Sequence, residues 1–347
     1  MLYISGEEVQ LASHICELAR RGFPLTCKQV KSLAYEFARR NNISGFLSTP
    51  KRMAGVKWFK AFMNRHPELK KTNAKNLSQH RATAAHPAAV NLFFAAFGRW
   101  KTEFKLTEGN QIWNVDESGV QDVPNDGDTV VSAKGESAFR IVSSEQGERA
   151  TILTYVSANG LVCPPMVIFK GEKVQTYWRV NAPGGVHVRA STSGYINRNL
   201  FAEYGRIFVQ FLNTMNLLDR NHLVLLDNHK SHLYNINYLQ KMSVNNIQIG
   251  SLPAHCTHYM QPLDDAPFAQ LKKTWNHNLI QQMREMLGMK MTKPEWLQLI
   301  ARTFRQSMTP NTVIAGFRHT GIWPTDPRVP KLMILKTYLI SKRKQGY

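Results

Sequence analysis

The sequence has few cysteines and no long apolar run. Its four cysteines, Cys16, Cys27, Cys163 and Cys256, are spread over 347 residues without a CxxC pair. This spacing argues against a disulfide framework or a zinc site and fits reduced intracellular thiols. No apolar stretch reaches the ~18 residues that a membrane-spanning helix needs, and the first residues lack the basic and apolar blocks of a signal peptide. We therefore expect no membrane partner.

Acidic residues are also scarce relative to basic ones. The chain has 44 Lys and Arg against 24 Asp and Glu, a formal net charge of +20. This excess predicts a polyanionic partner, with nucleic acid the first candidate. Because 43% of the residues are hydrophobic, the chain can bury a core. At ~150 residues per domain, the length predicts two domains.

The first 75 residues have the pattern of three short helices. Ser5 and Glu8 form the Ser-x-x-Glu pattern of a capping box before apolar residues at helical spacing, and Thr26 with Gln29 repeats such a box. A third apolar stripe, over residues 58–63, ends before Pro67. Three short helices with short connections predict a helix-turn-helix domain over residues 1–75.

The polar faces of these helices are basic. A solvated charged face is one interpretation, but few acidic residues are interleaved to neutralise the charges by i,i+4 pairing. Phosphate binding is therefore favoured, whereas the aromatic stripe of the third helix is predicted to be core. The candidate DNA-binding residues are Lys28, Lys31, Arg39, Arg40, Lys51, Arg52, Lys57, Lys60 and Arg65.

The remainder predicts a linker, a mixed α/β domain and a basic tail. Residues 76–107 are interpreted as a basic linker followed by a helix from Pro87 to Phe104 that docks on the second domain, 108–325, and residues 326–347 as the tail. Apolar runs predict strands, and Asn159-Gly160 predicts a hairpin turn. The predicted strands cover residues 112–115, 151–156, 161–163, 166–169 and 223–226. A long helix is predicted from about Asp265 to Leu287, and residues 292–295 are predicted to cap another.

Acidic residues follow two of these strands and precede the long helix. Asp116 and Asp227 each end an apolar run, and Asp264 lies in Gln261-Pro262-Leu263-Asp264-Asp265. Alone, each acid is weak evidence, because Asp after a strand is usually a turn residue and Asp before a helix is a favoured N-cap. We expect Asp265 to cap the helix and Asp264 to face the site. Three converging carboxylates repel one another unless divalent cations neutralise them, and Mg²⁺ prefers such oxygen ligands. Two such ions can clamp the attacking and leaving oxygens of a phosphoryl displacement.

Segments in both predicted domains resemble a known family. Residues 55–69 (GVKWFKAFMNRHPEL) are similar to the end of the centromere-protein-B-type helix-turn-helix domain of pogo, Tigger and Jerky-like transposases. The resemblance implies two such modules in series, of which this chain begins at the second. In the second domain, Asn114–Gly119, Leu225–His232 and Gln261–Asp264 look like the family's three catalytic motifs, with supporting matches at Gly147–Thr151, Ser193–Tyr195 and Gly316–Pro324.

The resemblance implies a helix-turn-helix domain followed by an RNase H-like catalytic domain of the DDE superfamily. It also implies DNA cleavage and strand transfer, with Asp116, Asp227 and Asp264 as catalytic ligands of two Mg²⁺ (or Mn²⁺) ions. The expected partner is double-stranded DNA, bound in the nucleus, and a homodimer on DNA fits this interpretation. Asp265-Ala266-Pro267 departs from the family pattern, where a small or apolar residue and then Gly follow the third Asp. The alternative is a domesticated nuclear DNA-binding protein that keeps the fold without strand transfer.

Three further patterns are weaker. His255-Cys256-Thr257-His258 offers side chains that can bind zinc. Ligands this close in sequence rarely complete a tetrahedral zinc site, so we interpret the segment as a loop. His229 and His232 fit a surface role better than a phosphate contact. Lys342-Arg343-Lys344 is short for a nuclear address.

Overall fold

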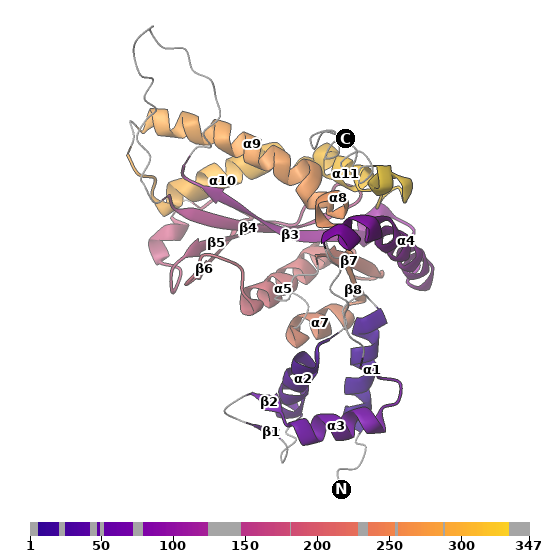
Figure 1. Cartoon of the computed structure of the whole chain (residues 1–347). Helices are drawn as coiled ribbons and strands as arrows, with labels where there is room; N and C mark the ends of the chain where they lie inside the picture. The colour runs from indigo at the N-terminus through magenta and orange to yellow at the C-terminus, as the bar shows by residue number, and fades with distance from the viewer. Residues whose placement is uncertain are drawn as a thin grey trace.

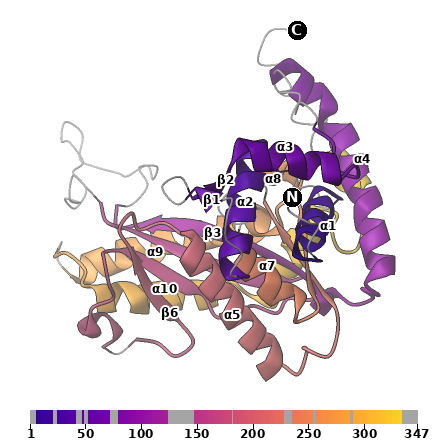
Figure 2. The same cartoon turned by 90° about the horizontal axis from the view of Figure 1, so that it is seen from below.

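The chain folds into a small N-terminal helical domain and a larger α/β domain (Figure 1). The computed structural model describes residues 6–20, 25–41, 47–48, 52–71, 79–123, 147–180, 182–227, 235–253, 256–286 and 289–332. Figures 1 and 2 place the N-terminal domain on one side of the central sheet, below helices α5 (Arg198–Thr214) and α7 (Ile236–Ser243). Leu25 packs against the cores of both domains and so joins them.

The N-terminal domain confirms the predicted three-helix pattern. Its elements are α1 (Gly6–Arg20), α2 (Cys27–Arg40), the short strands β1 (Leu47–Ser48) and β2 (Met53–Ala54), and α3 (Val56–Arg65). The capping box at Thr26 forms, because the Thr26 hydroxyl accepts from the Gln29 backbone N–H and the Gln29 side chain accepts from that of Thr26. The aromatic stripe of α3 is core, with Phe62 fully buried. The antiparallel β1–β2 pair between α2 and α3 was not predicted.

The larger domain is built on a six-stranded sheet. Its strands are β3 (Ile112–Gln121), β4 (Arg149–Ser157), β5 (Met166–Lys170), β6 (His187–Ser191), β7 (His222–Leu226) and β8 (Ile247–Ser251). Their order is β6-β5-β4-β3-β7-β8, with β3, β4 and β5 antiparallel in succession and β7 and β8 parallel to β3. This arrangement is RNase H-like, as the resemblance implied.

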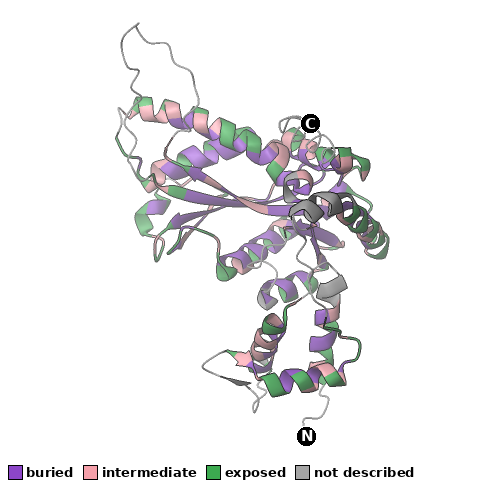
Figure 3. Ribbon diagram, viewed as in Figure 1, coloured by how far each residue is buried: buried purple, intermediate pink, exposed green. Residues whose placement is uncertain are grey.

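Helices cover both faces of the sheet (Figures 1 and 3). One face packs against α5 and α7. The other face is covered by α4 (Gln79–Glu103), α8 (Thr257–Met260), α9 (Pro262–Glu285), α10 (Lys293–Ser307) and α11 (Pro310–His319), and the 3₁₀ turns η1 (Gly109–Gln111) and η2 (Thr176–Arg179) lie at the sheet's margins. Phe97 and Trp100 join α4 to this core, so the helix docks on the second domain as predicted.

Several boundaries differ from the predictions for identifiable reasons. β3 continues well past Asp116, because β4 pairs with it as far as Gln121. Residues 161–163 make one isolated bridge, Val162 with Val156, because Pro164 and Pro165 follow and prolines cannot donate to a ladder. Helix α4 begins earlier than Pro87, at Gln79, and α9 begins at Pro262 rather than Asp265.

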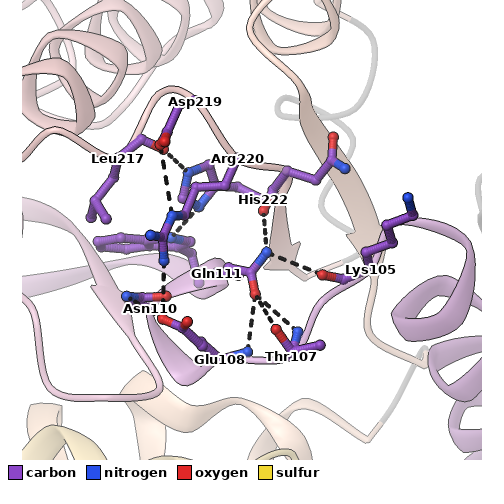
Figure 4. Close-up of polar contacts among 11 residues, drawn as sticks. Lys105, Thr107, Glu108, Asn110, Gln111, Leu217, Asp219, Arg220 and His222 are labelled. Atoms are coloured by element: carbon purple, nitrogen blue, oxygen red, sulfur yellow. Dashed lines mark hydrogen bonds and ion pairs between the residues drawn. The ribbon is translucent and has the colours of Figure 1, made fainter.

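The starts of β3 and β7 are joined by a polar cluster (Figure 4). The Gln111 amide donates to the carbonyls of Lys105 (3.3 Å) and Asn221 (3.1 Å), and Arg220 pairs with Glu108 at 3.0 Å. Beside them, the fully buried His222 ring accepts from Trp113 Nε1 through Nδ1 (3.2 Å), and its Nε2 lies 2.8 Å from the Leu217 carbonyl. Both contacts are satisfied only by the neutral ring carrying its proton on Nε2.

A second buried side chain, Asn114, connects three segments. Its Nδ2 donates to the Leu225 carbonyl on β7 at 2.9 Å, and its Oδ1 accepts from the Leu263 backbone N–H in α9 at 3.0 Å. The side chain is fully buried. Asn114 therefore uses its donor and its acceptor to fix β7 and the start of α9 relative to β3.

Protonation of His222 should weaken folding as the pH falls. Burial lowers the pKa of His222 from its ordinary 6.5, and the Arg220 charge adds to this effect against the Leu217 contact. Because the unfolded chain takes up the proton first, this contribution to the free energy of unfolding is intact above about pH 7.5 and falls below pH 6.5, by at most about 1.4 kcal/mol per pH unit. Urea unfolding at several pH values should show the wild-type advantage over His222→Gln shrinking toward pH 5.5. A constant difference would contradict this assignment.

Removing the Asn114 amide should cost stability. In Asn114→Ala the Leu225 carbonyl and the Leu263 N–H remain buried without that partner, so we expect a loss of about 2 to 4 kcal/mol in the free energy of unfolding. Asn213→Ala, at an exposed position of α5, is the matched control and should change it by less than about 0.5 kcal/mol. Denaturant unfolding of both variants measures the difference. Equal losses would contradict the conclusion that the two Asn114 hydrogen bonds stabilise the fold.

Candidate active site

Asp116 lies where β3 loses one of its neighbours. The parallel strand β7 pairs with β3 only at residues 112–114, whereas β4 pairs along the whole length. Asp116 therefore lies inside a continuous strand, and the prediction that it follows the end of the strand was wrong. It is half-buried and lies just beyond the last residues that β7 covers. The strand holds its backbone rigid while one side of the strand is open.

Asp227 and Asp264 approach from the two neighbouring segments. Asp227 directly follows β7, as predicted. Asp264 lies in the first turn of α9, whose N-cap is Gln261, so the expectation that Asp265 caps this helix was wrong. Asp265 instead pairs with His319 of α11 at 2.7 Å. Pro262 at the first helical position begins the helix earlier, because its ring favours that place.

Helix α11 holds the first turn of α9 in position. A Cβ at Gly316 would overlap the Pro262 carbonyl oxygen, so only glycine lets the two helices approach this closely. Together with the Leu263–Asn114 bond and the Asp265–His319 pair, this contact fixes the turn that carries Asp264. The closing motif Gly316–Pro324 thus has a structural role in supporting α9.

The three aspartates influence one another electrostatically. Burial is the first cause that raises the pKa of Asp116 well above its usual range, and the negative charges of Asp264, Glu117 and Asp227 raise it further. Partial removal of its carboxyl from water also raises the pKa of Asp264; Lys272 opposes this shift and Asp227 adds to it. The structure therefore brings the charges of all three predicted residues close enough to repel.

The residues present suit a hard divalent cation in their chemistry. They are carboxylates, the oxygen donors that Mg²⁺ and Mn²⁺ prefer, and their mutual repulsion is the kind that a cation relieves. Among the described residues, no three His, Cys, Asp or Glu side chains are close enough to hold one ion together. The arrangement fits ions that take one or two protein carboxylates each and complete their shell with water and phosphate oxygens.

Of the side chains in the weaker sequence patterns, the structure describes Cys256 alone. Cys256 is buried in the core, where burial raises its thiol pKa to about 11. His255, His229 and His232 lie outside the described residues, as does the basic tripeptide 342–344.

The predicted DNA-binding residues are distributed over α2, the β1–β2 connection and α3. Exposed side chains are Lys28, Arg39, Arg52, Lys57 and Lys60, and Lys31 is half-buried. The Arg40 side chain and Lys51 lie outside the described residues. Arg65 differs from the others, because its guanidinium pairs with Glu8 at 2.5 Å and 3.1 Å. Arg65 thus joins α3 to α1, a long-range pairing that helical spacing could not indicate.

A cavity lined by three cationic side chains and one acidic one, Glu36, lies between the two domains. Its volume is about 390 Å³, and the cations are Lys28 and Arg52 of the N-terminal domain and Arg198 at the start of α5. Sequence analysis did not single out Arg198, which carries no motif and lies in the other domain. Only the folded structure places it beside the predicted DNA-binding residues.

Comparisons with known proteins agree with this organisation. Residues 147–317 match the DDE superfamily endonuclease model, a range that contains Asp227 and Asp264 but not Asp116, and residues 5–73 match the Tc5 transposase DNA-binding domain. Among solved structures, the chain is similar to the Mos1 transposase paired-end complex with left transposon end (11% identity, TM-score 0.40, 91% of this chain and 80% of that chain). It is also similar to the mariner Mos1 paired end complex with Mg (12% identity, TM-score 0.39, 91% and 80%).

One curated relative is of a different kind. The MFS-type transporter clz9 of Cochliobolus lunatus is 24% identical over 191 residues, which are 55% of this chain and 20% of that protein. The chain thus spans only a fifth of that relative's length. No helix in the described ranges is long and apolar enough to cross a membrane. The two domain matches show that the chain carries a DDE superfamily endonuclease domain, preceded by a Tc5 transposase DNA-binding domain.

Proposed function

We propose that the chain is a pogo/Tigger-like transposase that cuts and joins DNA at Asp116, Asp227 and Asp264. The observation that carries the proposal is the coupling of these carboxylates across three separate segments. The pKa of Asp116 is raised by its burial and by the charges of both other aspartates. Three acids kept in mutual repulsion by a strand, the end of a neighbouring strand and a helix cost stability, and metal-assisted phosphoryl transfer is a function that needs them there.

The protein's own contribution to the reaction is position and charge. When bound, two Mg²⁺ or Mn²⁺ ions would supply a Lewis acid and an activated water for in-line attack on a phosphodiester. Asp116 would provide ligand oxygens from the centre of the sheet, Asp227 from the end of β7 and Asp264 from the first turn of α9. Asn114, which hydrogen-bonds to both neighbouring segments, keeps these three backbones in register.

The N-terminal domain would deliver double-stranded DNA to this site. Its exposed lysines and arginines on α2 and α3 fit the phosphate backbone, and the Tc5-type match supports a DNA-binding role. The match to a DNA-binding domain supports action in the nucleus. In this proposal two copies of the chain bind DNA as a homodimer.

Loss of any one triad carboxylate should abolish DNA cleavage. Asp116→Asn, Asp227→Asn and Asp264→Asn each keep the side-chain shape but remove a charged ligand. Because the metal ligands act as a unit, we expect each change to remove most of the activity and the losses not to add. The measurement is nicking of supercoiled plasmid with Mg²⁺ or Mn²⁺, with EDTA as the blank.

Asp265→Asn is the matched control for this series. It lies in the same helical turn but pairs with His319, so it should retain nicking and alter stability by about 1 kcal/mol or less. Nicking that persists in Asp227→Asn would rule out the triad. DNA binding without nicking by the wild type would favour the alternative of a DNA-binding protein that has lost strand transfer.

DNA affinity should depend steeply on salt through the N-terminal domain. Each phosphate neutralised by Lys or Arg contributes about 0.9 to the slope of log K against log salt. The double variant Lys57→Ala and Lys60→Ala removes two exposed cations from α3. We therefore expect weaker binding to all sequences and a slope lower by about 0.9 for each phosphate that the variant leaves without a cation. Titrations at several salt concentrations measure this slope.

A charge-matched control separates local contacts from net charge. Lys173 and Lys241 are exposed in the second domain, and their replacement by alanine removes the same charge. The proposal expects this control to leave the slope nearly unchanged. Equal slopes for both double variants would contradict the proposal that Lys57 and Lys60 of α3 contact DNA phosphates.

A further inference from the structure

Two short motifs outside the triad meet the last glycine of the first catalytic motif, beyond Asp116 on β3. The motifs are Gly147–Thr151 at the start of β4 and Ser193–Tyr195 after β6, and the glycine is Gly119. Gly119 pairs with Thr151, and Gln121 pairs with Arg149. Gly119 lies about 10 Å along the strand from Asp116. The side chain that connects the three segments is Arg149.

Arg149 is exposed but held in one place. Its Nη1 donates to the Tyr195 hydroxyl at 3.0 Å, and its guanidinium lies 4.7 Å from the centre of the Tyr195 ring. A Cβ at Gly119 would overlap the guanidinium, so the absence of a side chain lets Arg149 lie across β3. The guanidinium therefore extends over β3 from the start of β4.

The loop that carries Tyr195 is itself anchored. The Thr151 hydroxyl donates to the Gly194 carbonyl at 2.9 Å, and the Ser191 hydroxyl donates to the Tyr195 carbonyl at 2.7 Å. Gly194 has φ +75°, a conformation that favours glycine. Residues of all three segments thus hold the Arg149 guanidinium in place. A surface arginine that only contacts water needs no such contacts.

Arg149 lines a small basic cavity with Lys272 of α9. The cavity has a volume of about 210 Å³ and includes Gly119, Gln121 and Trp275, whose indole N–H donates to the Gln121 carbonyl at 2.8 Å. Among the described residues that line it, two are cations and none is acidic. Lys272 lies on the same helix as Asp264, about two turns further along. Helix α9 thus connects this cavity to the turn that carries the third aspartate.

We propose that this cavity binds one backbone phosphate of the DNA strand that passes the active site. This proposal rests on the proposed function. Arg149 offers a planar set of N–H donors that matches two phosphate oxygens, and Lys272 supplies a second positive charge. A phosphate held here fixes the strand relative to the carboxylates without contacting a base, so the site positions DNA and carries no sequence preference.

The test is the salt dependence of DNA binding by the full chain in EDTA. On a mixed-sequence duplex, the double variant Arg149→Gln and Lys272→Gln should lower the slope of log K against log salt by about 0.9, the value for one phosphate. Gly119→Ala keeps both charges but displaces the guanidinium, and it should lower the slope in the same direction. Tyr195→Phe, which removes only the hydroxyl, should weaken binding less than Gly119→Ala does.

The control double variant Lys173→Gln and Lys241→Gln removes the same charge elsewhere and should retain the wild-type slope. If Arg149→Gln with Lys272→Gln matches this control, the phosphate site is overturned. Melting by circular dichroism checks that each variant is folded, and Tyr195→Phe covers the case in which Gly119→Ala is not. Because binding is measured without metal or cleavage, the result stays valid even if the triad is inactive. If the wild type nicks DNA but Arg149→Gln with Lys272→Gln leaves the slope unchanged, only the phosphate site is refuted.

Discussion

The geometry of the candidate active site depends on one buried amide. Asn114 donates to the end of β7 and accepts from the first turn of α9, so a single side chain sets the relative positions of the segments that carry all three aspartates. Burial first, and then the charges of the neighbouring carboxylates, raise the pKa of Asp116, so the three aspartates repel one another. Hydrogen bonds between neutral groups therefore oppose the repulsion among the carboxylates. Asn114, an uncharged residue of the first motif, makes these bonds from β3 to β7 and to α9.

Much of the fold was predictable because its signals are local. Capping boxes at Thr26 and Thr292 and the apolar run of β7 depend on neighbouring residues and formed as expected. The length of β3 was not predictable in this way, because the polar residues after Val115 are kept in the strand by pairing with β4. The start of α9 was misplaced for a related reason, since its first turn is anchored by Asn114 and Gly316, both distant in sequence.

The candidate site follows the same division. The three aspartates could be named because each lies beside a recognisable strand or helix and because the motifs occur in the family's order. The functions of the surrounding cations could not be separated by sequence. Arg65 is neutralised by Glu8, Arg198 joins the N-terminal basic residues across the domain boundary, and Arg149 is fixed by Tyr195. The partner or neighbour that distinguishes each arginine lies tens of residues away in the sequence. Charge and helical spacing therefore cannot predict which arginines are free to contact DNA.

The open side of β3 has a consequence for self-association. Beyond Asn114 no strand in the described part of the chain pairs with this side, which leaves a stretch of backbone able to template a foreign strand. Helix α9 lies against it, and the Trp275 indole occupies the Gln121 carbonyl. The helix that carries the third aspartate thus also shields the unpaired part of β3 beside the candidate active site. Helix α9 therefore both carries Asp264 and protects the edge of β3 from pairing with a strand of another molecule.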